Sequence, residues 1–183
     1  MLRTELSLPA VVFMLTAIVF TTGCASSIDG RAYENQTPAI DLGSFFEGKV
    51  KAWGIVQNRS GNIIQRFTVD IIGTRDGNQL VLDETFEYQV GEGPTQRTWT
   101  LEQTESGVWR GKANDIDDQA TGKVYGNAFN LVYQMEVPVN GRQVKVTLND
   151  WFWLMDKSTL INRSYIRKFG LTFAEISIFM QRQ

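Results

Sequence analysis

Short segments in which polar and apolar residues alternate restrict the fold of this chain more than any other feature. From residue 48 onwards the alternation has the two-residue period of a β-strand, and no stretch shows the 3.6-residue period of a helix. Turn sequences separate the segments, among them Asn58-Arg59-Ser60-Gly61 and Asn140-Gly141, of which the second is a strong hairpin signal. We therefore predict about nine or ten strands. They cover residues 49–57, 62–73, 79–89, 96–103, 108–113, 121–125, 127–137, 142–155, 159–169 and 171–181.

The connections between these strands are uniformly short, which predicts an antiparallel meander. A meander leaves two exposed edges unless its first and last strands pair, and an up-and-down barrel removes both edges. A two-sheet sandwich is the alternative, although it usually needs longer crossing connections. We expect an all-β fold, a lipocalin-like up-and-down antiparallel β-barrel. With about 8–10 strands, the interior of such a barrel is wide enough for one small ligand.

The residues before the strands divide into three parts. Residues 41–48 predict a short helical turn capped by Asp41, with Leu42, Phe45 and Phe46 on one side. Residues 24–40 are polar and contain a proline, so we expect them to form a tether. The predicted organisation is a signal peptide over residues 1–23, a tether over 24–40 and a barrel domain over 41–183.

The N-terminus has the pattern of a targeting segment. An apolar run from Leu6 to Phe20 is shorter than the roughly 20 residues that cross a bilayer as a helix, and it ends at Cys24. This junction resembles the lipobox of bacterial lipoproteins, although Thr21 stands where leucine is usual. We expect cleavage before Cys24, acyl chains on its sulfur, and retention in the outer membrane facing the periplasm, because Ala25 is not the aspartate of inner-membrane retention. An ordinary signal peptide and an uncleaved anchor are the alternatives.

The composition excludes several classes of protein. The 183 residues include no histidine and one cysteine, so histidine-based triads, histidine zinc sites and intrachain disulfides are ruled out. The net charge of −2 argues against a nucleic-acid partner. Asp115, Asp117 and Asp118 lie close together but lack the spacing of a calcium-binding EF-hand loop. We therefore expect a non-enzymatic protein with no metal and no cofactor.

Residues 149–156 form the most unusual predicted strand, because both of its faces are apolar. Asp150 in this strand would lie among apolar side chains and would need a partner, for which Arg163 and Lys168 on the next strand are candidates. The alternative is that these residues are structural or surface charges. The candidate ligand-binding residues are Trp53, Asp150, Trp151, Asn162, Arg163 and Lys168. The aromatic residues expected to fill the core are Trp53, Phe67, Phe86, Trp99, Trp109, Phe129, Phe152 and Phe173.

Several short motifs together resemble one family of proteobacterial lipoproteins, catalogued as domain of unknown function 3833. The motifs are Ala52-Trp53-Gly54, Asn114-Asp115, Gly126-Asn127-Ala128, Asp150-Trp151, Asn162-Arg163 and Lys168-Phe169-Gly170. The resemblance covers roughly residues 38–182. The family has no established activity, so the resemblance implies a lipid-anchored envelope protein but assigns no catalytic residue.

Two functions follow from these observations. The first is a periplasmic barrel that binds a hydrophobic or amphipathic ligand such as a fatty acid or phospholipid. The second is a structural or assembly factor that docks on another envelope protein through an apolar surface patch. In both, the protein is held at the membrane by the acyl chains on Cys24.

Overall fold

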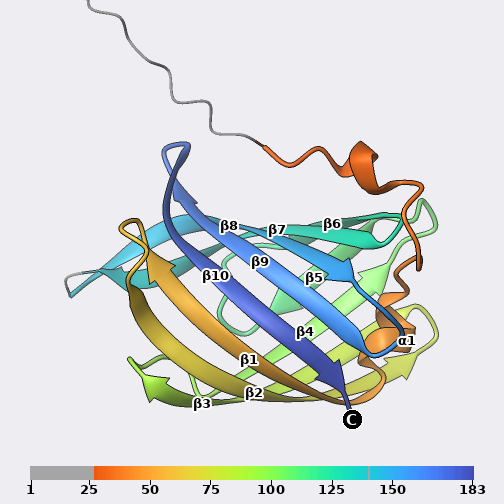
Figure 1. Cartoon of the computed structure of the whole chain (residues 1–183), viewed down its shortest axis with the longest axis horizontal. Coiled ribbons are helices and arrows are strands. Elements are labelled where there is room, and N and C mark those ends of the chain that lie inside the picture. The colour runs from red at the N-terminus through yellow and green to blue at the C-terminus, as the bar shows by residue number, and fades with distance from the viewer. Residues whose placement is uncertain (1–26, 140) are drawn as a thin grey trace, which may run out of the picture.

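Ten antiparallel strands close into a barrel in the computed structural model, which describes residues 27–139 and 141–183 (Figure 1). The order around the barrel is β1-β10-β9-β8-β7-β6-β5-β4-β3-β2, so each strand pairs with its neighbours in sequence and β1 pairs with β10. The strands are β1 (Gly48–Asn58), β2 (Ile63–Asp76), β3 (Gln79–Val90), β4 (Gln96–Gln103), β5 (Trp109–Ala113), β6 (Ala120–Tyr125), β7 (Ala128–Val139), β8 (Arg142–Leu154), β9 (Thr159–Lys168) and β10 (Leu171–Arg182). The predicted signal peptide and Cys24 lie outside the described residues.

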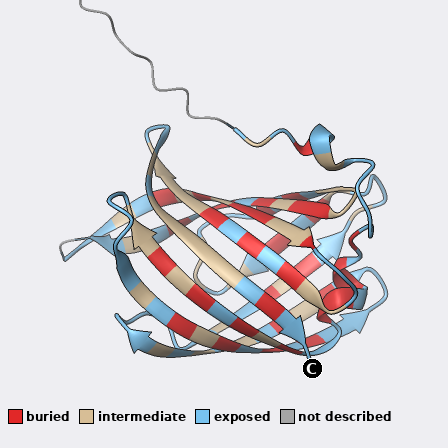
Figure 2. Cartoon of the chain, viewed as in Figure 1, coloured by how far each residue is buried: buried red, intermediate tan, exposed pale blue. Residues whose placement is uncertain are grey.

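The predicted barrel is confirmed, and the sandwich alternative is wrong. Nine consecutive residue pairs join β1 to β10, from Val50 opposite Arg182 to Asn58 opposite Ala174. This pairing satisfies the backbone groups of both edges that a meander would expose. Buried and exposed residues alternate along the strands, as the two-residue period predicts (Figure 2).

A short helix closes one end of the barrel. The helix α1 (Leu42–Phe46) begins after Asp41, whose Oδ1 accepts a hydrogen bond of 3.0 Å from the backbone N–H of Ser44, as predicted for the cap. Leu42, Phe45 and Phe46 are buried. The carbonyl oxygen of Phe46 lies so close to Gly73 of β2 that a Cβ at Gly73 would be only 1.9 Å away. The helix therefore fits against β2 only because Gly73 has no side chain.

The described part of the predicted tether lies against the outer wall of the barrel. It contains a 3₁₀ turn, η1 (Gly30–Tyr33), which contacts β6 and β7. The ring of Tyr33 packs 6.1 Å from that of Trp151 and 6.0 Å from that of Trp153, centroid to centroid. Gly30 is buried beneath the ring of Tyr125. None of the helices in residues 27–139 and 141–183 is long or apolar enough to span a bilayer.

The two ends of the barrel interior differ. We call the end covered by α1 the closed end, where Leu80, Phe129, Leu154 and Leu160 are buried. We call the other end the open end; it is ringed by the β1–β2, β3–β4, β5–β6, β7–β8 and β9–β10 connections (Figure 1).

Candidate ligand-binding site

Toward the open end of the barrel, several inward-facing apolar side chains keep part of their surface exposed to solvent. Val56 and Phe67 are buried there, whereas seven other residues that face inward, by their alternation with outward-facing neighbours, are half-buried. They are Phe86 and Tyr88 of β3, Val137 of β7, Val144 of β8, Ile166 of β9, and Ala174 and Ile176 of β10. These half-buried apolar side chains are the candidates for contact with a ligand in the interior.

One wall of this interior is polar. Asp150 of β8 is buried, and its Oδ1 accepts a hydrogen bond from the hydroxyl of Ser164 on β9. Its Oδ2 accepts a second bond, of 3.2 Å, from the hydroxyl of the buried Tyr133 on β7. Asp150 is therefore held by two neutral donors on the two flanking strands, and no salt bridge reaches it in the described part of the chain.

The polar wall continues across β3 and β4. Glu84 and Arg97 face each other across these two strands, and both side chains point into the barrel. The guanidinium of Arg97 donates to Oδ2 of Asp115 through Nε, at 2.9 Å, and through a second nitrogen. Asp115 belongs to the β5–β6 loop, whose Ile116 packs against the core, so the loop folds toward the interior. Glu84 makes no side-chain hydrogen bond among the described residues.

Burial changes the ionisation of Glu84 and Asp150, two of the carboxyl groups in this wall. Burial raises the pKa of Glu84 from 4.5 to about 7, although the positive charge of Arg97 opposes the shift. Burial also raises the pKa of Asp150, from 3.8 to about 6, against the hydrogen bonds from Ser164 and Tyr133. Burial followed by the charge of Asp150 raises the pKa of Tyr133, so its hydroxyl remains a donor. The wall can therefore accept and release protons near neutral pH.

The opposite wall is apolar and comes from β10, β1, β2 and the end of β3. The rings of Phe67, Phe86 and Tyr88 form one cluster with centroids 5.8 to 6.3 Å apart. Phe67 lies against Gly54 of β1, where a Cβ would come within 2.4 Å of the ring. Ile176 of β10 adds an aliphatic side chain to this wall.

Two of the predicted ligand-binding residues face the interior. Asp150 does so as described, and Asn162 is buried beside it, with its Nδ2 donating a bond of 3.2 Å to the carbonyl of Trp151. Lys168 is the last residue of β9 and lies at the rim of the open end, 5.4 Å from the ring of Phe169. A role for these residues in binding stays a prediction.

The other three predicted residues lie on the outer wall of the barrel, and a role for Trp53 and Trp151 in binding stays a prediction. Trp53 points outward and is 43% exposed, and Trp151 is buried on the outer wall beneath Tyr33. Arg163 also points outward and pairs with Glu175 of β10 at 2.5 Å, so it does not neutralise Asp150. Neither Trp53 nor Phe173, which is 47% exposed, fills the core as predicted. The other six aromatic residues of that prediction belong to the core or pack against it.

Sequence reasoning missed Glu84, Arg97 and Tyr133. The signal for Glu84 was present, because it lies two and four positions after Leu82 and Leu80 and so shares their inward face. The role of Arg97 depends on its register opposite Glu84, which the sequence does not specify. Within the described residues, no group of three or more side chains is placed to hold a metal ion.

Comparisons with known proteins define the family and support the fold. Residues 18–182 match the model of a family described as protein of unknown function (DUF3833). No curated protein matches the sequence. Among solved structures, the chain is similar to the S-type phycobiliprotein lyase CPES from Guillardia theta, with a TM-score of 0.53 and 8% sequence identity. The similarity covers 77% of this chain and 90% of the lyase.

Proposed function

This chain belongs to the DUF3833 family, whose description names no function, and we propose from its geometry that the open end of the barrel binds a hydrophobic or amphipathic molecule. The observation that carries the proposal is the pairing of an apolar wall with a polar wall inside the barrel. The aromatic cluster of Phe67, Phe86 and Tyr88 accommodates an apolar tail, and the wall around Asp150 accommodates a polar head group. The similar barrel of a protein named as a phycobiliprotein lyase supports ligand binding.

The charges of the polar wall favour one kind of head group. Three carboxyl groups, those of Glu84, Asp115 and Asp150, surround the single guanidinium of Arg97, which Asp115 already engages. The anion of a free fatty acid would meet these carboxyl groups, and the one guanidinium among them is already engaged by Asp115. A head group that carries an ammonium or several hydroxyl donors would satisfy Glu84, which has no hydrogen-bond partner in the described structure. Of a fatty acid and a phospholipid, the wall therefore favours a phospholipid with an ammonium head group.

The proposed setting is the outer membrane, facing the periplasm, with the protein anchored by acyl chains on Cys24. The support is the apolar run that ends at the only cysteine of the chain. The proposed activity is binding without chemical conversion, so the ligand is chemically the same before and after it binds. Conversion of a ligand during incubation with the purified protein would contradict this part of the proposal.

Mass spectrometry of the purified full chain tests the proposal. We compare the wild type with Phe86→Asn and with Thr85→Asn, because these adjacent residues of β3 face the interior and the outer surface, respectively. We expect lipid to be extracted from the wild type and from Thr85→Asn, and most of it to be lost from Phe86→Asn, because an amide replaces an aromatic contact with the tail. The mass of the intact protein shows in the same sample whether Cys24 is acylated.

Two outcomes would contradict ligand binding in the barrel. Equal amounts of lipid on both variants would place the lipid on the outer surface. A wild type without lipid that crosslinks to another envelope protein would favour the assembly-factor hypothesis.

A further inference from the structure

A row of apolar side chains crosses the outer wall of the barrel at one level. The row runs from Trp153 of β8 through Ile161 of β9 and Phe179 of β10 to Trp53 of β1, and each is the register partner of the next. Ile161 is 39% exposed, Phe179 42% and Trp53 43%, and the rings of Phe179 and Trp53 lie 5.8 Å apart. We call these four residues the outer apolar row. Large apolar side chains that are exposed side by side mark a surface with a binding partner.

The apolar surface continues on two sides of the row. Beside Trp53, a hollow of about 560 Å³ extends over β1 and β2 and is bordered by Ile55 and Arg66. Toward the open end, Leu171 and Phe173 of β10 are about half exposed, and Phe169 in the β9–β10 turn is 89% exposed. Phe169 has a φ of 52°, in the left-handed region that favours glycine or asparagine. The turn itself therefore gives no reason for a phenylalanine at this tip.

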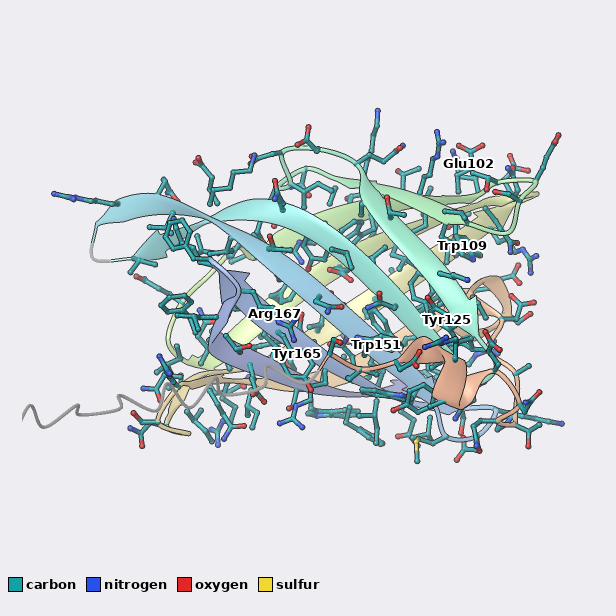
Figure 3. All side chains as sticks on the ribbon, turned by 90° about the horizontal axis from the view of Figure 1, so that it is seen from above. Glu102, Trp109, Tyr125, Trp151, Tyr165 and Arg167 are labelled. Carbon is teal, nitrogen blue, oxygen red and sulfur yellow. The ribbon has the colours of Figure 1, made fainter. Side chains whose placement is uncertain are left out.

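The strands that carry this surface are strongly basic. β9, β10 and β1 contain six lysine or arginine residues and one acidic residue, Glu175. Two of the six are paired, Arg163 with Glu175 and Lys51 with Asp70 of β2. Arg167 stacks 5.3 Å from the ring of Tyr165 and joins no salt bridge in the described part of the chain (Figure 3). Strands β3 to β7 contain five acidic and four basic residues, so the excess of positive charge belongs to one side of the barrel.

The N-terminal segment reaches the barrel beside the same row. Tyr33 of η1 packs on Trp153, the first member of the row, and on the adjacent Trp151, which is labelled in Figure 3. Cys24 precedes Tyr33 by nine residues, which span at most about 30 Å. If Cys24 is acylated, as the proposed function holds, the outer apolar row lies within that reach of the bilayer.

We propose that the outer apolar row and the β9–β10 tip dock on the surface of an anionic bilayer. Tryptophan and phenylalanine insert at the level of the head groups, and lysine and arginine contact the anionic lipids. The docked barrel lies with β9, β10 and β1 toward the membrane. In this orientation the open end is held beside the lipid that the proposed function names as its ligand.

Vesicle binding by residues 27–183 tests the docking surface without the anchor. This fragment contains all ten strands, and the core cluster draws only on residues from Ile40 to Met180, so the fold is complete in it. We expect the fragment to bind vesicles with roughly 30% anionic lipid, to bind neutral vesicles weakly, and to dissociate as salt is raised. The double variant Trp53→Ser, Phe179→Ser should lower the partition coefficient at least about tenfold.

Matched variants separate docking from general effects. Arg66→Gln beside the row should weaken binding to anionic vesicles about fivefold, whereas Lys112→Gln on the outer face of β5 should not. Val132→Ser, which removes a 38% exposed apolar side chain from β7, should also leave binding unchanged.

Three results would overturn the docking proposal. The first is no binding to anionic vesicles, and the second is an equal loss of vesicle binding in the Val132 and row variants. The third is a lipid-free dimer that the row variants dissociate, because a second copy of the chain would then cover the row. Phe86→Asn should leave vesicle docking intact. A failure of ligand binding in the interior can therefore be distinguished from a failure of docking.

Discussion

The closed and open ends of the barrel are built from the same strands, but their inward-facing side chains have different roles. At the closed end, which α1 covers, the side chains of Leu80, Phe129 and Leu160 are almost fully buried. Toward the open end, inward-facing positions also hold Glu84, Arg97 and half-buried apolar residues such as Ile176. A fully apolar, close-packed region contributes most to stability, whereas buried polar groups cost stability and specify what can bind.

A single strand can both stabilise the fold and line the site. In β3, Leu80 and Leu82 point into the closed end, and Glu84, Phe86 and Tyr88 follow on the same face toward the open end. The strand is held by the first pair, so the remaining inward positions can carry groups that would not stabilise a fold alone. Stability and binding should therefore respond to substitutions at different levels of the same strands.

Leu160→Ala should have the largest effect on stability. Leu160 is fully buried at the closed end, and its truncation leaves a cavity that costs about 2–5 kcal/mol in the free energy of unfolding. The matched change Ile176→Ala at the open end removes a half-buried side chain and should cost about 1 kcal/mol. Denaturant unfolding of both variants gives the two values. Equal losses would show that the open end is packed as tightly as the closed end and would remove the distinction.

Glu84→Gln should change how stability depends on pH. Because the pKa of Glu84 is raised to about 7, the folded chain keeps a proton that the unfolded chain releases above about pH 4.5. The stability of the wild type should therefore fall as the pH rises from about 4.5 to about 7. Asp150 acts in the same direction between about pH 4 and 6. At pH 8 we expect the free energy of unfolding of the glutamine variant to exceed that of the wild type by about 1–3 kcal/mol. Water at the open end keeps this gain small, because it lowers the cost of the charge on Glu84.

Urea unfolding at several pH values measures this slope. Glu87→Gln serves as the control, since Glu87 is exposed on the outer face of the same strand. A wild type whose stability is flat from pH 4.5 to 8 would show that Glu84 is well solvated, and the polar wall would then be part of the surface rather than of the interior.

The fold could be predicted from the sequence because each of its determinants is local. The alternation within strands and the glycine and asparagine turns give the strand bounds; the strand over Gln96–Gln103 has the predicted limits, and most of the others differ by one or two residues. Closure between β1 and β10 is not local, but the short connections leave few other ways to satisfy the edges. Asp41 likewise predicts α1, because its side chain caps a neighbouring backbone group.

The site could be predicted only in part, because it depends on which face of a strand points inward. Both faces of β8 are apolar, so the alternation around Asp150 and Trp151 does not reveal that η1 covers the outer one. The predicted partners of Asp150 were wrong, because we expected its negative charge to pair with a positive charge on the neighbouring strand. Arg163 lies one position from Ser164 and therefore on the other face of the strand, where it forms a salt bridge with Glu175. Register and facing are tertiary properties that a single sequence leaves open.

Phe169→Asn should have the smallest effect on stability, and of the opposite sign. Phe169 adopts a left-handed backbone conformation at the tip of the open end, which costs a phenylalanine about 1 kcal/mol and an asparagine less. The side chain is 89% exposed, so its removal sacrifices almost no packing. We expect the free energy of unfolding to rise by about 0.5–1 kcal/mol while binding of residues 27–183 to anionic vesicles weakens. A matched change in the β7–β8 turn, Gly141→Asn, should leave vesicle binding unchanged, because that turn lies outside the basic strands. An asparagine variant that is both more stable and equally well bound would show that the strained phenylalanine at the open end does not contact the membrane.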